Sequence, residues 1–214
     1  YIKYVDLLIK VWYNHTEVSK LIFSYQELLL KYKNYKNPKD KINREINDGK
    51  YYRLRKELYE DNINTAGYLL ASSIESPSYL SFEYALSRYG LIPERVNVYT
   101  SATALKKHNK TVKNIFGEFY YTDIPVNVWN KGVLINTEIN YTYMIATPEK
   151  ALCDLLYKKE PVYSIKQLKV LLFDNLRIDE SLFDSLDKEA IISICDDYKK
   201  RNLRILKTML LGGE

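Results

Sequence analysis

The segment NPKDKINREINDGKYYRLRKELYE, residues 37–60, is the most informative part of the sequence. Asn37 can cap a helix, and Pro38 suits the first helical position because its missing N–H would have no partner there. Gly49 is placed to end that helix in a left-handed conformation. The flanking YYRL and ELYE stretches predict a two-stranded hairpin with a turn at Arg55–Lys56. The segment therefore predicts a short helix followed directly by a β-ribbon.

Two further helices are expected before this segment. Residues 1–20 carry apolar side chains at helical spacing. Ser24 and Glu27 form a capping-box pattern for a helix that runs to about Tyr32. Helix, helix, turn, helix and β-ribbon is the order of a winged helix-turn-helix, in which residues 38–48 would lie in the major groove of DNA.

Positive charge is concentrated in the same part of the chain. The 214 residues carry a net charge of +5. Residues 31–56 hold ten Lys or Arg against three acids, whereas residues 61–214 hold nineteen of each sign. Compositional bias toward lysine does not explain this segregation. Clustered positive charge favours a polyanionic partner, most often nucleic acid.

Helical geometry places Arg44 nearly opposite the apolar pair Ile42 and Ile46, on the outer side of the expected helix. Arg and Asn side chains suit guanine and adenine edges, and the hairpin cations suit phosphates. Asp40 and Asp48 share the outer side and oppose binding to phosphates. The alternative is a small helical domain whose solvated basic face has no nucleic-acid role. The residues expected to contact double-stranded DNA are Lys39, Lys41, Asn43, Arg44, Asn47, Lys50, Arg53, Arg55 and Lys56.

Residues 61–66 have the composition of a connection, so we expect two domains, 1–62 and 63–214. The second domain mixes strand-like and helical patterns and ends in helices. The expected fold class is therefore α+β, with an N-terminal winged helix-turn-helix followed by a mixed α/β domain. The expected elements are a short strand and helix over 78–90, strands over 95–100, 116–124 and 133–146, a helix over 147–159 with Thr147 as its cap, and helices over 164–176 and 188–211.

Two stretches of this second domain carry a resemblance. SYLSFEYALSRYGLIPERVNVYTSAT at 78–103 and IATPEKALCDLLY at 145–157, together with FGEFYY at 116–121, resemble the AbiEi family of antitoxins from type IV toxin–antitoxin systems. The resemblance implies a winged-helix domain that binds operator DNA as an autorepressor. It also implies a C-terminal domain that counteracts a nucleotidyltransferase-like toxin without forming a stable complex. It implies no catalytic residues.

Other functions are weighed against this one. Asp123 and Glu138 lie in strand-like stretches, and two carboxylates could hold Mg²⁺ in a nucleic-acid-processing enzyme. A third hypothesis is a protein-interaction module whose basic face binds an acidic partner. The sequence has no metal-ligand motif and no phosphate-binding loop, so we expect no enzyme activity, cofactor or metal. With no membrane span expected, and with Cys153 and Cys195 interpreted as reduced buried thiols, a cytoplasmic location is predicted.

Overall fold

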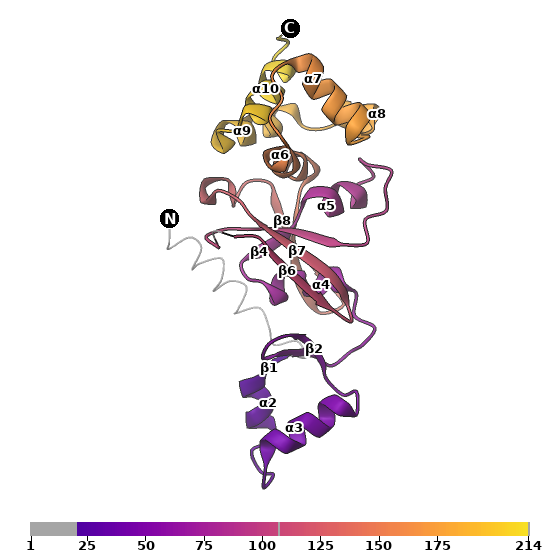
Figure 1. The fold of residues 1–214 in the computed structure, drawn as a ribbon, viewed down its shortest axis with the longest axis vertical. Helices are drawn as coiled ribbons and strands as arrows, with labels where there is room; N and C mark the ends of the chain where they lie inside the picture. Colours follow the sequence, from indigo (N-terminus) through magenta and orange to yellow (C-terminus); the bar gives the residue numbers. More distant parts are fainter. Residues whose placement is uncertain (1–20, 107, 214) are drawn as a thin grey trace.

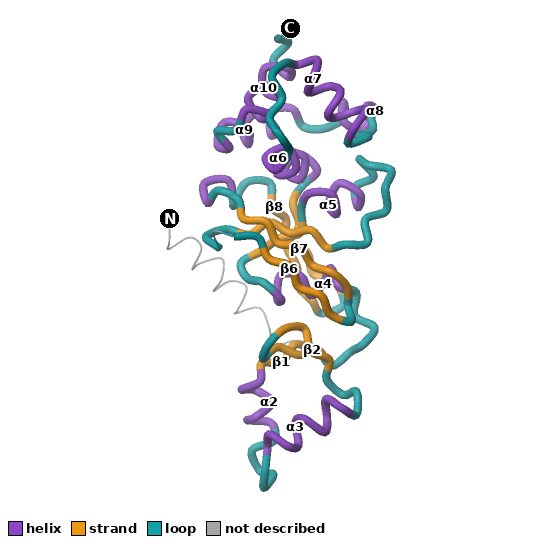
Figure 2. Tube along the Cα trace, in the orientation of Figure 1, coloured by secondary structure: helices purple, strands orange, loops and turns teal. Residues whose placement is uncertain are grey.

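The computed structural model describes residues 21–106 and 108–213, and the helix expected over residues 1–20 lies outside these described residues. The molecule is elongated (Figure 1). A small N-terminal unit forms one end, a six-stranded sheet forms the middle, and the C-terminal helices form the other end. The alternation of helices and strands along the chain is plain in Figure 2. The fold class is α+β, as the sequence predicts.

The N-terminal unit combines two helices with a three-stranded antiparallel sheet of order β1-β3-β2. Strand β1, of only three residues, was not expected from the sequence. The hairpin turn lies at Lys56–Glu57, one residue later than predicted, because Glu57 adopts the left-handed conformation with φ of +62°. The elements are β1 Ile22–Ser24, α2 Tyr25–Lys31, α3 Pro38–Asn47, β2 Tyr52–Arg55 and β3 Leu58–Glu60.

Both helices of this unit begin and end as their sequences indicate. The Ser24 side chain and the Glu27 side chain form a complete capping box at the start of α2. At the start of α3, Asn37 accepts a hydrogen bond from the backbone N–H of Asp40. Gly49, with φ of +73°, follows α3 and allows the next N–H to return to the last helical turn.

The central sheet is mixed, with strand order β6-β7-β5-β4-β9-β8. Strands β5 and β7 are parallel, as are β4 and β9, and the other neighbours are antiparallel. The strand expected over 95–100 begins only at Tyr99, and β6 was not expected. The strands are β4 Ser78–Leu80, β5 Tyr99–Thr103, β6 Lys110–Asn114, β7 Gly117–Asp123, β8 Val133–Glu138 and β9 Tyr141–Ala146.

Helices cover the central sheet and continue beyond it. In Figure 1, α5 and α6 lie on the side of the sheet that faces the C-terminal helices. The helix expected over 188–211 is broken, because Lys199 adopts the left-handed conformation with φ of +48° and separates α9 from α10. The helices are α4 Gly67–Ile74, α5 Phe82–Arg88, η1 Val126–Val128, α6 Pro148–Lys158, α7 Ile165–Lys169, η2 Val170–Asn175, α8 Glu180–Asp184, α9 Lys188–Tyr198 and α10 Arg201–Leu210.

The buried side chains form two hydrophobic clusters. The larger one fills the space between the central sheet and its helices. The smaller one holds the N-terminal unit together and consists of Leu28, Tyr32, Ile42, Tyr51 and Tyr59. None of the helices in the described part of the chain is both long enough and apolar enough to cross a lipid bilayer.

Polar and aromatic contacts join the N-terminal unit to the central sheet. The side-chain amide of Asn114 donates to the Leu54 carbonyl at 2.9 Å. The Tyr141 hydroxyl donates to the Glu60 carboxylate at 2.7 Å. Leu54 itself belongs to the larger hydrophobic cluster. Each of these hydrogen bonds joins a residue before the connection at 61–66 to a residue after it. The division into domains 1–62 and 63–214 remains a prediction.

Candidate nucleic-acid interface

Helix α3 presents one apolar side to the smaller hydrophobic cluster and one polar side to solvent. Ile42 is fully buried, and Ile46 packs against the same cluster. Arg44 and Asn47 are exposed on the opposite side. This is the orientation that the spacing of the apolar residues predicts for a helix. The outer side of α3 is therefore accessible to a partner.

The β2–β3 hairpin displays its cations on the same small unit as α3, at the end of the unit nearer the central sheet (Figure 1). Arg53 and Arg55 are exposed, whereas Leu54 between them is buried, which follows the alternation of side chains along a strand. Tyr51, at the start of the hairpin, and Tyr59 are buried in the smaller cluster together with Ile42 of α3. This shared packing fixes the hairpin relative to α3.

All nine residues expected at the interface lie in the N-terminal unit. Eight are exposed, and Lys41 is half-buried with 27 % of its side chain accessible. The structure thus brings the nine onto one unit at the end of the molecule away from α7–α10 (Figure 1). They are Lys39, Lys41, Asn43, Arg44 and Asn47 of α3, and Lys50, Arg53, Arg55 and Lys56 after it.

Glu45 lies beneath this surface, and its role was missed in the sequence analysis. Its side chain is only 7 % accessible and forms ion pairs with Lys41 and with Lys50, the latter at 2.6 Å. The Tyr32 hydroxyl donates a hydrogen bond to the same carboxylate. Hydrogen bonds from the two lysines lower the pKa of Glu45 to about 2. One carboxylate therefore already offsets one of the two positive charges that Lys41 and Lys50 bring to the expected interface.

The spacing of Lys41 and Glu45, four residues apart, was the available signal for that pair. The sequence could not reveal Lys50 as the second partner. That contact depends on the turn after α3, where Gly49 brings the chain back over the last turn of the helix. By contrast, no ion pair of Arg44, Arg53 or Lys56 is found within the described residues.

The two acids on the outer side of α3 have different surroundings. Asp40 accepts a hydrogen bond from the Asn37 amide at 2.6 Å and lies in the first helical turn, where the helix dipole favours negative charge. Asp48 is the C-cap residue and is exposed. Asp40 thus has a structural role in starting α3, while Asp48 is the acid that opposes a phosphate partner most directly.

Asp123 and Glu138, the carboxylates considered for a metal-dependent enzyme, do not form a joint site. Asp123 ends β7 and Glu138 ends β8, and the sheet order places β5, β4 and β9 between these strands. Asp123 accepts from the backbone N–H of Lys106, and Glu138 accepts from the Tyr68 hydroxyl. Within residues 21–106 and 108–213, no three His, Cys, Asp or Glu side chains gather as metal ligands.

A second group of polar side chains is buried under the central sheet, at helix α6. Lys150 and Asp154 are completely buried and form an ion pair at 2.9 Å. The hydroxyls of Tyr79 and Ser81 donate to Asp154 at 2.9 and 2.6 Å. Tyr198 of α9 accepts from Lys150 at 2.8 Å and donates to Asp154. We call these five residues the buried polar network.

The buried polar network binds together elements that are distant in the sequence. Burial, and next the charge of Asp154, raise the pKa of the Tyr198 hydroxyl far above its usual value. Each carboxylate oxygen of Asp154 accepts hydrogen bonds, so the buried charge is fully compensated. With all five side chains enclosed, the network links β4, α6 and α9 and offers no surface to a substrate.

Among known proteins, no family model and no curated protein matches the chain.

Proposed function

We propose that this chain is a DNA-binding antitoxin of the type IV class, related to the AbiEi family. In this proposal the N-terminal unit acts as a winged helix-turn-helix. It binds the operator of its own gene as an autorepressor in the cytoplasm. The larger unit counteracts a nucleotidyltransferase-like toxin without a stable complex and without catalytic activity of its own.

The observation that carries the DNA-binding part is the exposed, uncompensated charge on α3 and the hairpin. Arg44, Asn47, Arg53, Arg55 and Lys56 all face solvent on one small unit, in which Tyr51 and Tyr59 pack with Ile42 of α3 in a shared cluster. The order β1, α2, α3, β2, β3 supports a winged helix-turn-helix, with α3 as recognition helix and the hairpin as wing. The outer side of α3 would then contact bases, and the hairpin phosphates.

The antitoxin part rests on the sequence resemblance. Four members of the buried polar network, Tyr79, Ser81, Lys150 and Asp154, lie within the two stretches on which that resemblance depends. Buried polar groups that satisfy one another constrain the packing of a core to one arrangement.

A gel-shift experiment with the DNA upstream of the gene tests the interface. We expect the double variant Arg44→Ala/Arg53→Ala to bind far more weakly than the wild type. The wild-type affinity should fall with salt by about 0.9 log units per log unit of salt for each phosphate contacted. Lys166→Ala/Lys169→Ala removes the same charge from exposed positions of α7, at the other end of the molecule, and is the matched control.

Equal binding by wild type and the Arg44/Arg53 variant would reject the interface. Equal loss in both double variants would mean that only net charge matters. The antitoxin role needs a separate test, in which the chain is co-expressed with the toxin encoded beside it. We expect the Arg44/Arg53 variant still to restore growth, because the larger unit is unchanged. Co-purification of a stable protein partner without any DNA shift would favour an interaction module instead.

A further inference from the structure

The two edges of the central sheet differ in their side chains. Strand β6 forms one edge, and Lys110 and Lys113 are exposed along it. Lysines on an edge strand discourage a further strand from adding to the sheet. Strand β8 forms the other edge, and its sequence VLINTE contains no lysine and no proline. The β8 edge therefore lacks the protection that the β6 edge has.

Strand β8 also carries large apolar side chains that the protein leaves uncovered. Leu134 is 46 % accessible and Ile135 is 54 % accessible. Neighbouring residues of a strand point to opposite faces of the sheet, so the strand is uncovered on both faces at this edge. An exposed edge strand with apolar side chains is a site at which another strand can pair.

The turn that follows β8 adds a third exposed apolar residue. Ile139 and Asn140 form a two-residue turn to β9, and both are left-handed, with φ of +49° and +68°. Asn and Gly suit such a turn, whereas a β-branched residue is strained in this conformation. Ile139 is 72 % accessible, so burial within this chain does not offset its strain. A strained residue of this kind points to a functional contact.

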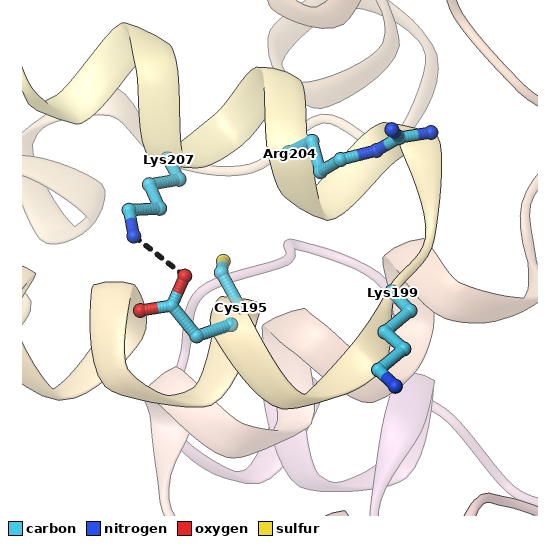
Figure 3. Close-up of a pocket in the computed structure, with 5 residues that line it drawn as sticks. Cys195, Lys199, Arg204 and Lys207 are labelled. Atoms are coloured by element: carbon cyan, nitrogen blue, oxygen red, sulfur yellow. Dashed lines mark hydrogen bonds and ion pairs between the residues drawn. The ribbon is translucent and has the colours of Figure 1, made fainter.

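The C-terminal helices show a different kind of surface. A shallow pocket between α9 and α10 is lined mainly by charged side chains, among them the exposed Lys199 and Arg204. In Figure 3 a dashed line marks the ion pair of Lys207 with Asp196 at this pocket. Charged groups are stable in water without a partner, whereas exposed aliphatic side chains gain free energy when another surface covers them. The β8 edge, and not the pocket, therefore favours a contact with protein.

The backbone of β8 has hydrogen-bonding groups to offer at this edge. Glu138 and Tyr141 flank the two-residue turn, so this pair exchanges its backbone hydrogen bonds, and every second residue before Glu138 also faces β9. The alternate residues, Val133, Ile135 and Thr137, direct their N–H and C=O groups away from β9. Within residues 21–106 and 108–213, no strand other than β9 is hydrogen-bonded to β8.

We propose that β8 pairs antiparallel with β8 of a second copy of this chain, so that two central sheets join across a two-fold axis. In this register Ile135 lies opposite Ile135 of the second copy, and Val133 lies opposite Thr137. All three outward-facing residues then exchange backbone hydrogen bonds. On the other face, Leu134 lies diagonal to Leu134 of the second copy, which is within reach of a side-chain contact.

The distribution of charge favours a second copy in this orientation. Glu138 is the one charged residue of β8, and it is at the end of the strand. Antiparallel pairing places the two Glu138 side chains at opposite ends of the interface, whereas parallel pairing would place them side by side, where they repel. The uncharged centre of the strand gives no match to a charged partner. The strand is thus complementary to itself, as a two-fold interface requires.

Sedimentation equilibrium of the whole chain, without DNA, tests the pairing. We expect the mass of the wild type to rise with concentration from one chain to two. Ile135→Lys should remain a monomer at the concentrations at which the wild type is a dimer, because two lysines would meet at the centre of the interface. The control is Ile115→Lys, the same substitution at a residue that is 61 % accessible in the β6–β7 turn, and it should dimerise like the wild type.

Four results would overturn the proposal. They are a wild type that stays monomeric at every concentration, a dimer that Ile135→Lys leaves intact, equal loss of the dimer in both variants, and assemblies that grow beyond two chains. Circular dichroism shows whether each variant is folded. Since no DNA is present, the outcome is independent of the proposed operator binding.

Cross-linking tests the register without disturbing the dimer. In Ile135→Cys the new thiol would lie opposite its own copy, so mild oxidation should give a disulfide-linked dimer on a non-reducing gel. Ile115→Cys should stay monomeric on the same gel. The native Cys153 and Cys195 are buried and are present in both variants. An Ile135→Cys protein that dimerises in solution but does not cross-link would overturn the register.

Discussion

Helices α3 and α6 begin in the same way and carry the same spacing of charge. Asn37 and Thr147 cap them, and a proline occupies the first helical position of each. Each then has a lysine followed four residues later by an acid, Lys41 with Glu45 in α3 and Lys150 with Asp154 in α6. Lys41 remains partly exposed to solvent, whereas Lys150 and Asp154 are both completely buried.

The difference lies in what surrounds the two carboxylates. In α3, Glu45 faces inward but holds two lysines that reach it from the surface. In α6, Asp154 is enclosed by the hydroxyls of Tyr79, Ser81 and Tyr198 as well as by Lys150. The same spacing of a lysine and an acid therefore gives a pair near the surface in α3 and a pair in the core at α6. The tertiary partners, not the helix, determine whether such a pair is available to other molecules.

The largest expected effect is on the buried pair. Asp154→Ala would leave the Lys150 ammonium buried without its counter-charge, and breaking a buried pair in this way costs about 3–5 kcal/mol. Urea unfolding should show a lower midpoint with the same slope. Asp174→Ala, at an exposed position, is the control and should change stability by less than about 0.5 kcal/mol.

The double variant Lys150→Met/Asp154→Leu sharpens the same comparison. It removes both charges together, so we expect it to be more stable than Asp154→Ala alone, because no unpaired charge remains. If the single and the double variant were equally unstable, the lost hydrogen bonds from Tyr79, Ser81 and Tyr198 would dominate over the charge.

The next largest effect is expected for Arg44→Ala, which should weaken DNA binding and leave folding unchanged. Loss of an arginine that contacts a base costs about 1–3 kcal/mol of binding free energy and relaxes specificity at that position. Lys56→Ala should instead weaken binding about equally on all sequences and reduce the salt dependence. Binding isotherms on operator and unrelated DNA distinguish the two. If both variants lost affinity equally on operator and unrelated DNA, Arg44 would contact phosphates and not bases.

Removal of the two helix caps should produce a smaller change. Asn37→Ala and Thr147→Ala each remove the side chain that accepts a backbone N–H at the helix start, which costs about 1 kcal/mol. Hydrogen exchange followed by mass spectrometry should show faster exchange in α3 for the first variant and in α6 for the second. Faster exchange throughout the chain in both variants would mean that the two units unfold together.

The smallest expected effect is on the stability of the protein at low pH. Glu45 has a pKa of about 2 in the folded protein, below its ordinary value of 4.5. Its stabilising contribution is therefore complete above 4.5 and is lost as the pH falls toward 2. In Glu45→Gln this contribution is missing, so urea midpoints of wild type and variant should converge over that range. A constant difference across the range would show that the charge of Glu45 has no part in stability.

Much of this fold could be predicted from short signals in the sequence. Helices α2, α3 and α6 have capping residues and apolar spacing, and the hairpin β8–β9 is rich in β-branched and aromatic residues. Helix α4 was missed because it has no side-chain cap and is buried on most sides, which leaves no polar face to mark its period. Strand β6, with the sequence KTVKN, was missed because its residues are mostly polar.

The candidate interface could be predicted only in part, for a related reason. Exposure of Arg44 and Asn47 follows from the period of one helix, and exposure of Arg53 and Arg55 from the alternation of one strand. The ion pair between Glu45 and Lys50 and the enclosure of Asp154 depend on chain segments that meet only in the folded state. Such contacts have no local signature.

The junction between the N-terminal unit and the central sheet has a practical consequence for anyone who wishes to study fragments. A protein cut within 61–66 would separate Glu60 from the Tyr141 hydroxyl, and burial already raises the pKa of that carboxyl. The cut would also expose the Leu54 side chain, which is buried in the larger hydrophobic cluster. The hydrogen bond from the Asn114 amide to the Leu54 carbonyl would be lost, because the two residues would be on different fragments. Each fragment would expose surface that is buried in the whole protein, so the two proposed roles should be tested on the intact chain.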